Sequence, residues 1–409
     1  MTVTMRVRLS VMMFLQFFVW GGWFVTLGTY LAHNLGASGG QLGLAFATQS
    51  WGAIVAPFIV GLIADRYFNA ERMLACLHLA GAALMFGLFR ARSFGTFYPL
   101  LLCYMMVYMP TLALVNSVGF RQMRDPAAEF SRVRVWGTLG WIVAGLAISL
   151  LFGWDSAEGI GSGALKNTFL MSALASLLLG VFSVTLPVTP PQAAREARVT
   201  LTDILGLKAL TLLRNRNFLA FFVSSILICV PLAFYYQNAN QFLVEIHVAN
   251  PTGKQTIGQM SEVFFMLLLP IFLKRFGMKA TLLVGMLAWC LRYALFAFGN
   301  AHEGVAMLLV GIALHGVCYD FLFVSGQIYT DSKAGSEFKS AAQGLITLAT
   351  YGVGMLIGFW AAGIISDHYV SEGIHDWRAI WLFPAAFAAF VGLFFLVSFR
   401  NEAVRYQEK

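Results

Sequence analysis

The chain of 409 residues contains twelve apolar stretches of about twenty residues, and this pattern constrains the fold more than any other feature. A run of about 20 apolar residues is long enough to cross the hydrocarbon core of a bilayer as a helix. The composition agrees, because 59% of the residues are hydrophobic and only 11% are charged, against about 25% in soluble domains. The sequence therefore predicts an all-α integral membrane protein with twelve transmembrane helices. The expected spans are residues 9–31, 41–64, 72–91, 95–118, 133–153, 168–187, 216–243, 255–273, 279–298, 303–329, 340–366 and 377–399.

The distribution of lysine and arginine predicts the orientation of the chain. Most of the 27 basic residues fall in the loops on the side that holds both termini. Loops rich in lysine and arginine remain in the cytoplasm, so both termini are expected there. This asymmetry also accounts for the net charge of +8 without a nucleic-acid-binding surface.

Residues 188–215 form the longest stretch that is not expected to lie in the membrane. Six expected spans precede it and six follow it. The predicted domains are a six-helix bundle over residues 1–187, a cytoplasmic linker over residues 188–215 and a second six-helix bundle over residues 216–409. Two such bundles around a central cleft are a common transporter architecture, with the substrate site near the bilayer midplane.

The loop after the second expected span has the sequence GLIADR, residues 61–66. Its Gly-x-x-x-Asp-Arg pattern resembles the signature loop of the major facilitator superfamily. The resemblance implies the major facilitator fold and a conformational role for Asp65 and Arg66, in which an aspartate at a helix end stabilises one closed state. An ordinary basic turn is the alternative interpretation.

A few charged residues lie deep inside the apolar stretches: Arg134, Glu262, Arg292 and Asp320. A charged group at the middle of a bilayer costs roughly 2.5–3.5 kcal/mol even on the most lenient scale. Such residues are therefore paired, protonated or exposed to a polar cavity, and together they predict a solute pathway. Arg134 lies near a helix end, so the alternative to a cavity role is that its side chain snorkels to the membrane interface. For Arg292 a structural ion pair or snorkelling away from the cavity is the favoured interpretation.

Amides and aromatic residues accompany these charges. Arg134, Thr138 and Trp141 are spaced at i, i+4 and i+7, so they share one helix face. Amides and aromatics suit a flat, neutral, hydrogen-bonding ligand. Packing is the alternative for His315 and for the helix 1 tryptophans Trp20 and Trp23. Arg134, Thr138 and Trp141 are candidate substrate-binding residues, and the further candidates are Tyr236, Gln237, Asn238, Gln259, Glu262, His315, Tyr319 and Asp320.

The two intramembrane carboxylates also predict a coupling ion. Burial disfavours the charged form of a carboxyl group, whereas a nearby arginine favours it. A carboxyl that alternates between such environments can load and release a proton. Glu262 or Asp320 is the expected proton carrier, with Arg134 as a possible counter-charge.

The chain resembles the bacterial nucleoside:proton symporters of the major facilitator superfamily. The likeness runs in order from the first expected helix to the last, so it covers nearly the whole chain. It rests on residues 14–23 (FLQFFVWGGW), 26–30 (TLGTY), 108–112 (YMPTL), Asn116, 134–140 (RVWGTLG), 259–262 (QMSE), 289–299 (WCLRYALFAFG), Asp320-Phe321, 342–344 (AQG) and 373–377 (GIHDW).

The resemblance implies site residues where the chain matches the family. Arg134, Thr138, Gln259, Glu262 and Asp320 stand where the family places nucleoside-contacting or proton-coupling residues. Other positions depart from the family pattern, which puts base and ribose selectivity in question while ring stacking is expected to survive. The departures are His315 in place of a tyrosine, Tyr319 and Trp141 each in place of a phenylalanine, Tyr236 in place of an asparagine, and Ala233 in place of a glutamine, with Gln237 or Asn238 available to compensate.

The predicted function is import of nucleosides coupled to protons by alternating access in a bacterial cytoplasmic (inner) membrane. The protein is expected to act as a monomer surrounded by lipid, with the proton as coupling ion and no cofactor or metal. Symport of another neutral polar solute, such as a sugar, is one alternative, and a non-transporting membrane sensor is another. Five scattered cysteines without CxxC spacing, and the lack of HExxH, GxSxG and Walker motifs, argue against a metal site, an enzyme or an ATP-driven pump.

Overall fold

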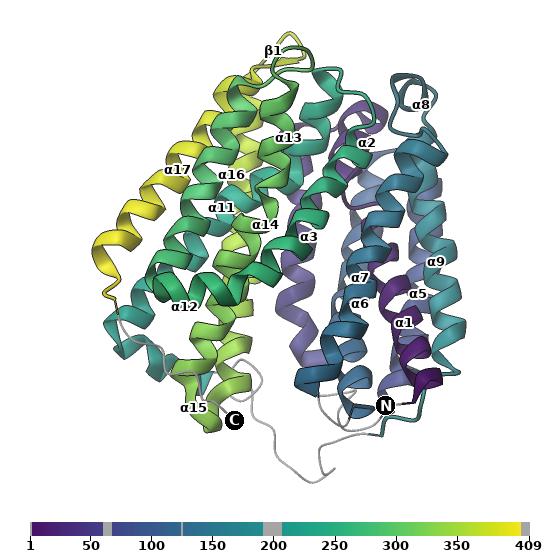
Figure 1. Ribbon diagram of the computed structural model, residues 1–409. Helices are drawn as coiled ribbons and strands as arrows, with labels where there is room; N and C mark the ends of the chain where they lie inside the picture. Colours follow the sequence, from purple (N-terminus) through teal and green to yellow (C-terminus); the bar gives the residue numbers. More distant parts are fainter. Residues whose placement is uncertain (1, 60–67, 124–125, 191–206, 402–409) are drawn as a thin grey trace. The chain divides into compact units, whose positions relative to one another are not determined.

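The computed structural model describes residues 2–59, 68–123, 126–190 and 207–401 and is built almost entirely of helices (Figure 1). The helical elements up to residue 190 are α1 (Val3–Gly21), α2 (Leu27–Leu35), α3 (Gly39–Ile59), α5 (Ala70–Arg90), α6 (Phe94–Arg121), α7 (Pro126–Leu146), η2 (Ala147–Leu151), α8 (Ala157–Gly161), η3 (Ala164–Lys166) and α9 (Asn167–Ser183). Those after residue 206 are η4 (Leu207–Arg214), α11 (Arg216–Glu245), α12 (Pro251–Phe298), α13 (Val305–Ala313), α14 (His315–Tyr319), η5 (Asp320–Val324), α15 (Ser325–Thr347), η6 (Leu348–Gly354), α16 (Met355–His368) and α17 (Trp377–Ser398).

The chain forms two compact units. Unit 1 comprises Met1–Ala37, Thr48–Val199 and Ala249–Thr256, and unit 2 comprises Ser38–Ala47, Thr200–Val248 and Ile257–Lys409. Within unit 1, α1 packs against α7 and α9, and α5 packs against α6 and α9. Within unit 2, α11 packs against α16 and α17 (Figure 1). The first turns of α3 and α12 belong to a different unit from the remainder of each helix.

Ten helices in the described part of the chain are long and apolar enough to cross a membrane. One of them, α12, has 48 residues, which at about 1.5 Å per residue is about 72 Å and more than twice the bilayer core of about 30 Å. Gly277 breaks this helix with φ 76° and ψ 176°, between the expected spans 255–273 and 279–298. The span expected at 41–64 is α3 as far as Ile59, and its remainder lies outside the described residues. The structure is therefore consistent with twelve spans.

The expected first span, residues 9–31, is interrupted. Helix α1 ends at Gly21, turns follow, and α2 begins at Leu27. The reason is packing: a Cβ on Gly22 would lie 2.6 Å from the hydroxyl of Ser172, and Trp23 is fully buried with its ring 5.6 Å from that of Tyr104. Close approach to the neighbouring helices therefore bends the backbone where the apolar pattern alone predicts a continuous helix.

The short segment that precedes α17 is a β-hairpin, in which β1 (Val370–Ser371) pairs with β2 (Ile374–His375). Gly373 has φ 79°, a conformation that glycine adopts without strain. Glu245, at the end of α11, accepts hydrogen bonds of 2.9 Å from both His375 Nδ1 and Trp377 Nε1. Residues 373–377 (GIHDW) therefore have a structural role, because they form the hairpin and the hydrogen bonds that connect α11 to α17.

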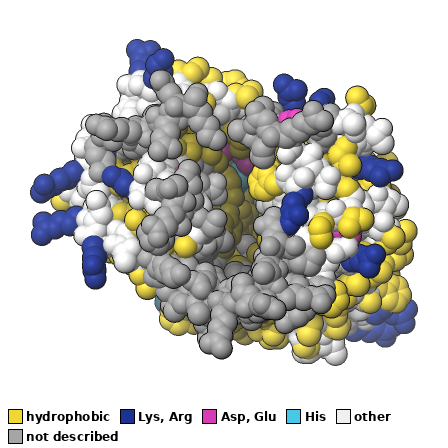
Figure 2. All heavy atoms as spheres, turned by 90° about the horizontal axis from the view of Figure 1, so that it is seen from below, with side chains coloured by type: hydrophobic (Ala, Val, Ile, Leu, Met, Phe, Trp, Pro, Cys, Tyr) yellow, Lys and Arg dark blue, Asp and Glu magenta, His cyan; other side chains and the backbone are white. Residues whose placement is uncertain are grey.

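Lysine and arginine side chains protrude on the face of the molecule shown in Figure 2, where acidic side chains are few among the described atoms. Exposed basic residues include Arg6, Arg8, Lys274 and Arg275. The predicted signature-loop residues Asp65 and Arg66 lie outside the described residues, as does most of the expected linker.

Two aspartates, the buried Asp155 and the exposed Asp367, hold the N-termini of long helices. Asp155 accepts hydrogen bonds from the hydroxyl of Ser149 and from the backbone N–H of Thr252 at 2.9 Å, within unit 1. Asp367 accepts from the N–H groups of Gly39 and Gly40 at 2.6 and 2.7 Å, within unit 2. Both carboxylates satisfy donors that the first turn of a helix leaves without a partner and meet the positive end of its dipole.

Replacing Asp155 by alanine is expected to lower thermal stability, because the Thr252 N–H at the start of α12 loses its acceptor. Loss of such a cap costs about 0.5–2 kcal/mol. The measurement is the melting temperature of the purified protein in detergent, with the exposed Glu158→Ala as the matched acidic control on the same segment. Equal melting temperatures for the two variants would contradict the assignment.

Candidate functional site

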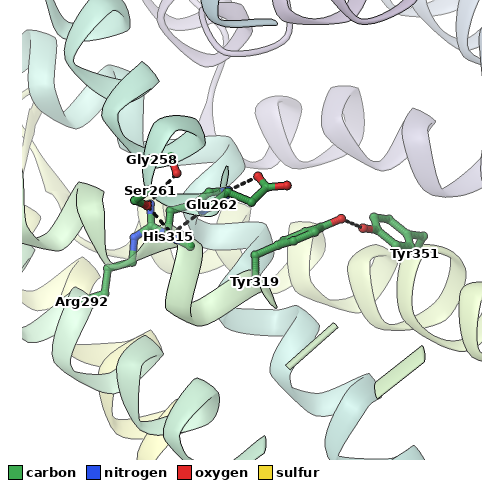
Figure 3. Close-up of polar contacts among 8 residues, drawn as sticks. Gly258, Ser261, Glu262, Arg292, His315, Tyr319 and Tyr351 are labelled. Carbon is green, nitrogen blue, oxygen red and sulfur yellow. Dashed lines mark hydrogen bonds and ion pairs between the residues drawn. The ribbon is translucent and has the colours of Figure 1, made fainter. Parts of the chain in front are cut away.

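Unit 2 contains a cluster of charged and aromatic side chains at the junction of α12 with α14 (Figure 3). Arg292 is completely buried, and its Nη1 lies 3.0 Å from Nδ1 of His315. Its guanidinium also lies over the ring of Tyr235, 3.5 Å from the ring centre. On the other side of the imidazole, His315 Nε2 lies 3.9 Å from Oε2 of Glu262. The cluster thus places a cation, an imidazole and a carboxylate in a row in space, with the imidazole in the middle.

Two glycines allow this arrangement by bringing the backbones of α12 and α14 together. A Cβ on Gly258 would lie 3.1 Å from Cβ of His315, and one on Gly316 would lie 2.5 Å from the carbonyl carbon of Ser261. The hydroxyl of Ser261 accepts the Gly316 N–H at 3.0 Å and donates to the Gly258 carbonyl at 2.8 Å (Figure 3). The position of His315 beside Glu262 is therefore set by backbone contact between the two helices.

Asp320 begins the π-helical turn η5, directly after α14. It is completely buried, and neither carboxylate oxygen has a hydrogen-bond partner in the described part of the chain. An ionised carboxylate buried without a partner is very costly, so this environment accommodates the group when it carries a proton. π-Turns are rare and frequently occur at functional sites.

Tyr319 extends the cluster toward α16. Its hydroxyl lies 2.5 Å from that of Tyr351 in η6 (Figure 3). The rings of His315, Tyr319 and Phe323 follow one another along the chain, with centroids 5.8 and 5.1 Å apart. This row of rings is suited to stacking with a flat ligand. Tyr351 was not among the residues that the sequence indicated, because its partner comes from a distant helix.

The amides expected on the seventh span, Gln237 and Asn238, form hydrogen bonds outside the cluster on α12 and α14. Gln237 donates to the Gly39 carbonyl at 3.4 Å, and Asn238 donates to the Ser366 hydroxyl at 3.1 Å. Each retains a buried carbonyl oxygen with no partner in the described residues. Tyr236 is half-buried beside the ring of Tyr235, and Gln259 is half-buried one turn before Glu262.

In unit 1, the predicted face of α7 lies against α1. Arg134 is half-buried with its guanidinium 4.0 Å from the ring centre of Phe17. One and two turns later come the half-buried Thr138 and Trp141, and the Trp141 ring lies 5.7 Å from that of Trp20. The three residues therefore share one face, as their spacing predicts.

A buried polar network lies behind this face, and its histidine, His78, was not indicated by the sequence. His78 contacts Oε1 of Gln16 at 2.8 Å through Nε2 and the hydroxyl of Ser176 at 3.0 Å through Nδ1. Gln16 also donates to Thr111 at 2.7 Å, and its backbone carbonyl accepts from the Tyr108 hydroxyl at 2.7 Å. A lone histidine in an apolar stretch gives no signal that would distinguish this role from ordinary packing.

The snorkelling interpretation of Arg292 is wrong. Snorkelling requires that the guanidinium reach the protein surface, whereas Arg292 has no exposed area and contacts His315, a candidate site residue. Its partners are an imidazole and the faces of aromatic rings, and both its Nε and Nη2 lack hydrogen-bond partners in the described residues. A contact between α12 and α14 cannot be inferred from periodicity along either helix.

In the described part of the chain, no group of three or more histidine, cysteine, aspartate or glutamate side chains is placed to hold a metal ion. The clusters instead combine buried charges, amides and aromatic faces within a bundle of membrane-crossing helices. Intramembrane ionisable groups of this kind mark substrate and ion pathways. The fold and the site together define a membrane transporter.

The chain belongs to the nucleoside H+ symporter family, whose model matches residues 1–404. It is 43% identical to YegT of Escherichia coli (strain K12) over 405 residues, which cover 96% of this chain and 93% of YegT. It is 34% identical to the xanthosine permease of the same organism over 413 residues, 97% of this chain and 96% of the permease. The protein is thus a transporter and not an enzyme.

A solved structure shares the fold over nearly the whole chain. The crystal structure of the nucleoside transporter NupG superposes with a TM-score of 0.86 at 28% identity, covering 97% of this chain and 100% of NupG. A NupG structure with an aspartate-to-alanine substitution superposes with a TM-score of 0.88. The predicted fold class, a helical transporter of the major facilitator type, is confirmed.

Proposed function

We propose that this protein carries nucleosides into the cell together with protons, and that the cluster on α12 and α14 takes part in both tasks. The observation that supports the proposal most strongly is Asp320. Its carboxyl group is buried within a membrane-crossing segment and has no hydrogen-bond partner among the described residues. Symport of nucleosides with protons is also the function that the family description names.

The side chains of the site match the chemistry of a nucleoside. A nucleobase has flat faces, which stack on rings such as those of Tyr319 and Trp141, and edges that hydrogen-bond to amides and carboxylates. We assign nucleoside contacts to residues of both units. They are Arg134, Thr138 and Trp141 in unit 1, and Tyr236, Gln237, Asn238, Gln259, Glu262, His315, Tyr319 and Asp320 in unit 2.

Asp320 and Glu262 are the proposed proton carriers. A carboxyl that is neutral while buried and ionised when opened to water takes up and releases one proton per cycle. The inward proton gradient sets the direction of transport. From the charge asymmetry of the loops we place both termini in the cytoplasm of a bacterial cell, in the inner membrane. The protein is proposed to work as a monomer, with Asp65 and Arg66 in a conformational role.

The test is uptake of radiolabelled uridine and adenosine into proteoliposomes with and without an inward proton gradient. Accumulation above the external concentration is expected with the gradient and is expected to disappear when an uncoupler is added. Protein-free liposomes give the background, and unlabelled maltose tests whether a sugar competes. Absence of uptake and of competition by any nucleoside would overturn the substrate assignment, and uptake insensitive to the gradient would overturn the coupling.

A further inference from the structure

Arg292 dictates where His315 carries its proton. The guanidinium group has only N–H donors and stays charged in proteins, so it cannot accept a hydrogen bond. Nη1 of Arg292 lies 3.0 Å from Nδ1 of His315, within hydrogen-bond distance. Nδ1 must therefore be the acceptor and carry no proton, since a proton there would place two donors face to face. The imidazole is held as the tautomer with its hydrogen on Nε2.

The guanidinium is rigidly held for this task. It is completely buried and stacks on the ring of Tyr235 at 3.5 Å, with Trp289 at 5.3 Å and Phe296 at 5.6 Å from its central carbon. The Tyr235 ring in turn stacks beside the imidazole, with centroids 5.6 Å apart and planes inclined by 28°. A planar guanidinium keeps its N–H direction in such a stack, whereas a lysine ammonium would not.

This tautomer determines which group His315 presents on the side of the ring that faces Glu262. Nε2, which carries the hydrogen, faces Oε2 of Glu262 at 3.9 Å, too far for a direct hydrogen bond. The site therefore presents a fixed donor next to a carboxylate acceptor, with a gap that a single polar group can bridge. In the other tautomer, Nε2 and the Glu262 carboxylate would both be hydrogen-bond acceptors, so they would repel an acceptor atom of the ligand.

We propose that Arg292 is a positioning residue, which makes His315 a hydrogen-bond donor toward the substrate by holding it in the Nε2–H tautomer beside Glu262. This inference rests on the proposed function for the identity of the ligand, but the tautomer itself does not depend on transport. Arg292 acts through His315 and makes no substrate contact of its own.

The direct test is nitrogen NMR of the protein labelled with ¹⁵N-histidine, because the two ring nitrogens give distinct signals when protonated and unprotonated. The chain has seven histidines, and the signals of His315 are those that disappear in His315→Gln. The expected result is a neutral ring with hydrogen on Nε2 in the wild type. In Arg292→Met, which removes the donor and the buried charge, the Nδ1–H tautomer is expected to become detectable beside the Nε2–H form, because nothing then excludes a proton from Nδ1.

Transport kinetics supply the second readout. Losing one oriented hydrogen bond is worth about 1 kcal/mol, so Arg292→Met is expected to raise the KM for uridine about fivefold while the maximal rate changes less than twofold. Arg292→Lys is expected to fall between Arg292→Met and the wild type, because its ammonium can donate but does not stack in a fixed direction. Lys274→Met, an exposed charge removal in the same unit, is expected to match the wild type.

A wild-type His315 that is protonated on Nδ1, or a tautomer unchanged in Arg292→Met, would overturn the inference even if every variant transports uridine. A tautomer that shifts without any change in KM would overturn the role in substrate binding. Failure of the wild type to transport any nucleoside would instead contradict the proposed function and leave the tautomer result to stand by itself.

Discussion

Replacing Asp320 by asparagine is expected to abolish proton-driven accumulation of nucleoside while the protein remains folded. Asparagine has nearly the shape of a protonated aspartate, so it fits the buried position in which neither carboxylate oxygen finds a partner among the described residues. It carries no proton that the transport cycle can release. Accumulation of uridine in proteoliposomes is therefore expected to fall to the level that an uncoupler gives with the wild type.

The matched control is Glu303→Gln, which removes an exposed carboxylate from the same unit and is expected to accumulate uridine like the wild type. Proton uptake, followed with a pH-sensitive dye, should be lost together with accumulation in Asp320→Asn. Normal accumulation and proton uptake in Asp320→Asn would remove this residue from the coupling mechanism. If only Glu262→Gln shows the loss, the proton is carried by Glu262.

Replacing Gly140 by alanine is expected to destabilise the protein severely. A Cβ at this position would lie 2.1 Å from the backbone carbonyl oxygen of Phe14 and 3.1 Å from the backbone nitrogen of Phe18. Backbone atoms cannot rotate away as side chains do, so α7 would have to separate from α1. Overpacking costs typically 1–3 kcal/mol and occasionally more, and a backbone clash this close places the cost at about 3 kcal/mol or above.

The measurement is the yield and the melting temperature of the protein in detergent. Gly95→Ala is the control in the same unit, because a Cβ there would meet no atom within 4 Å. The control is expected to melt at the wild-type temperature or slightly above it, since alanine is a better helix former than glycine. Similar melting temperatures for both variants would show that α1 and α7 are not in the contact described. Small residues that let helices approach closely are a recurrent feature of membrane proteins.

The candidate site was predictable where neighbours along one helix carry the signal. The spacing of Arg134, Thr138 and Trp141 places them on one face of α7, and charges such as Glu262 and Asp320 stand out within apolar stretches. The break at Gly277 also falls between two expected spans. These features depend on helical periodicity and on local composition, which are written along the chain itself.

Contacts between distant helices were not predictable in this way. Arg292 was expected to lie away from the cavity, but tertiary packing places it on His315. The pairing of Tyr319 with Tyr351 joins residues from separate elements, and the network of His78 with Gln16 joins α5 to α1. No spacing rule within one helix contains this information.

The amino-acid sequence alone predicts a helical membrane protein, because the length of an apolar stretch is compared directly with the thickness of a bilayer. The charged residues within those stretches predict a transporter. Ordered strings that extend over nearly the whole chain also predict the family, which the match over residues 1–404 confirms. Which nitrogen of His315 faces a donor and which faces a carboxylate depends on how α12 and α14 pack against each other. Hydrogen bonding depends on differences of less than 1 Å between residues far apart in the chain, and these arise only when the helices pack.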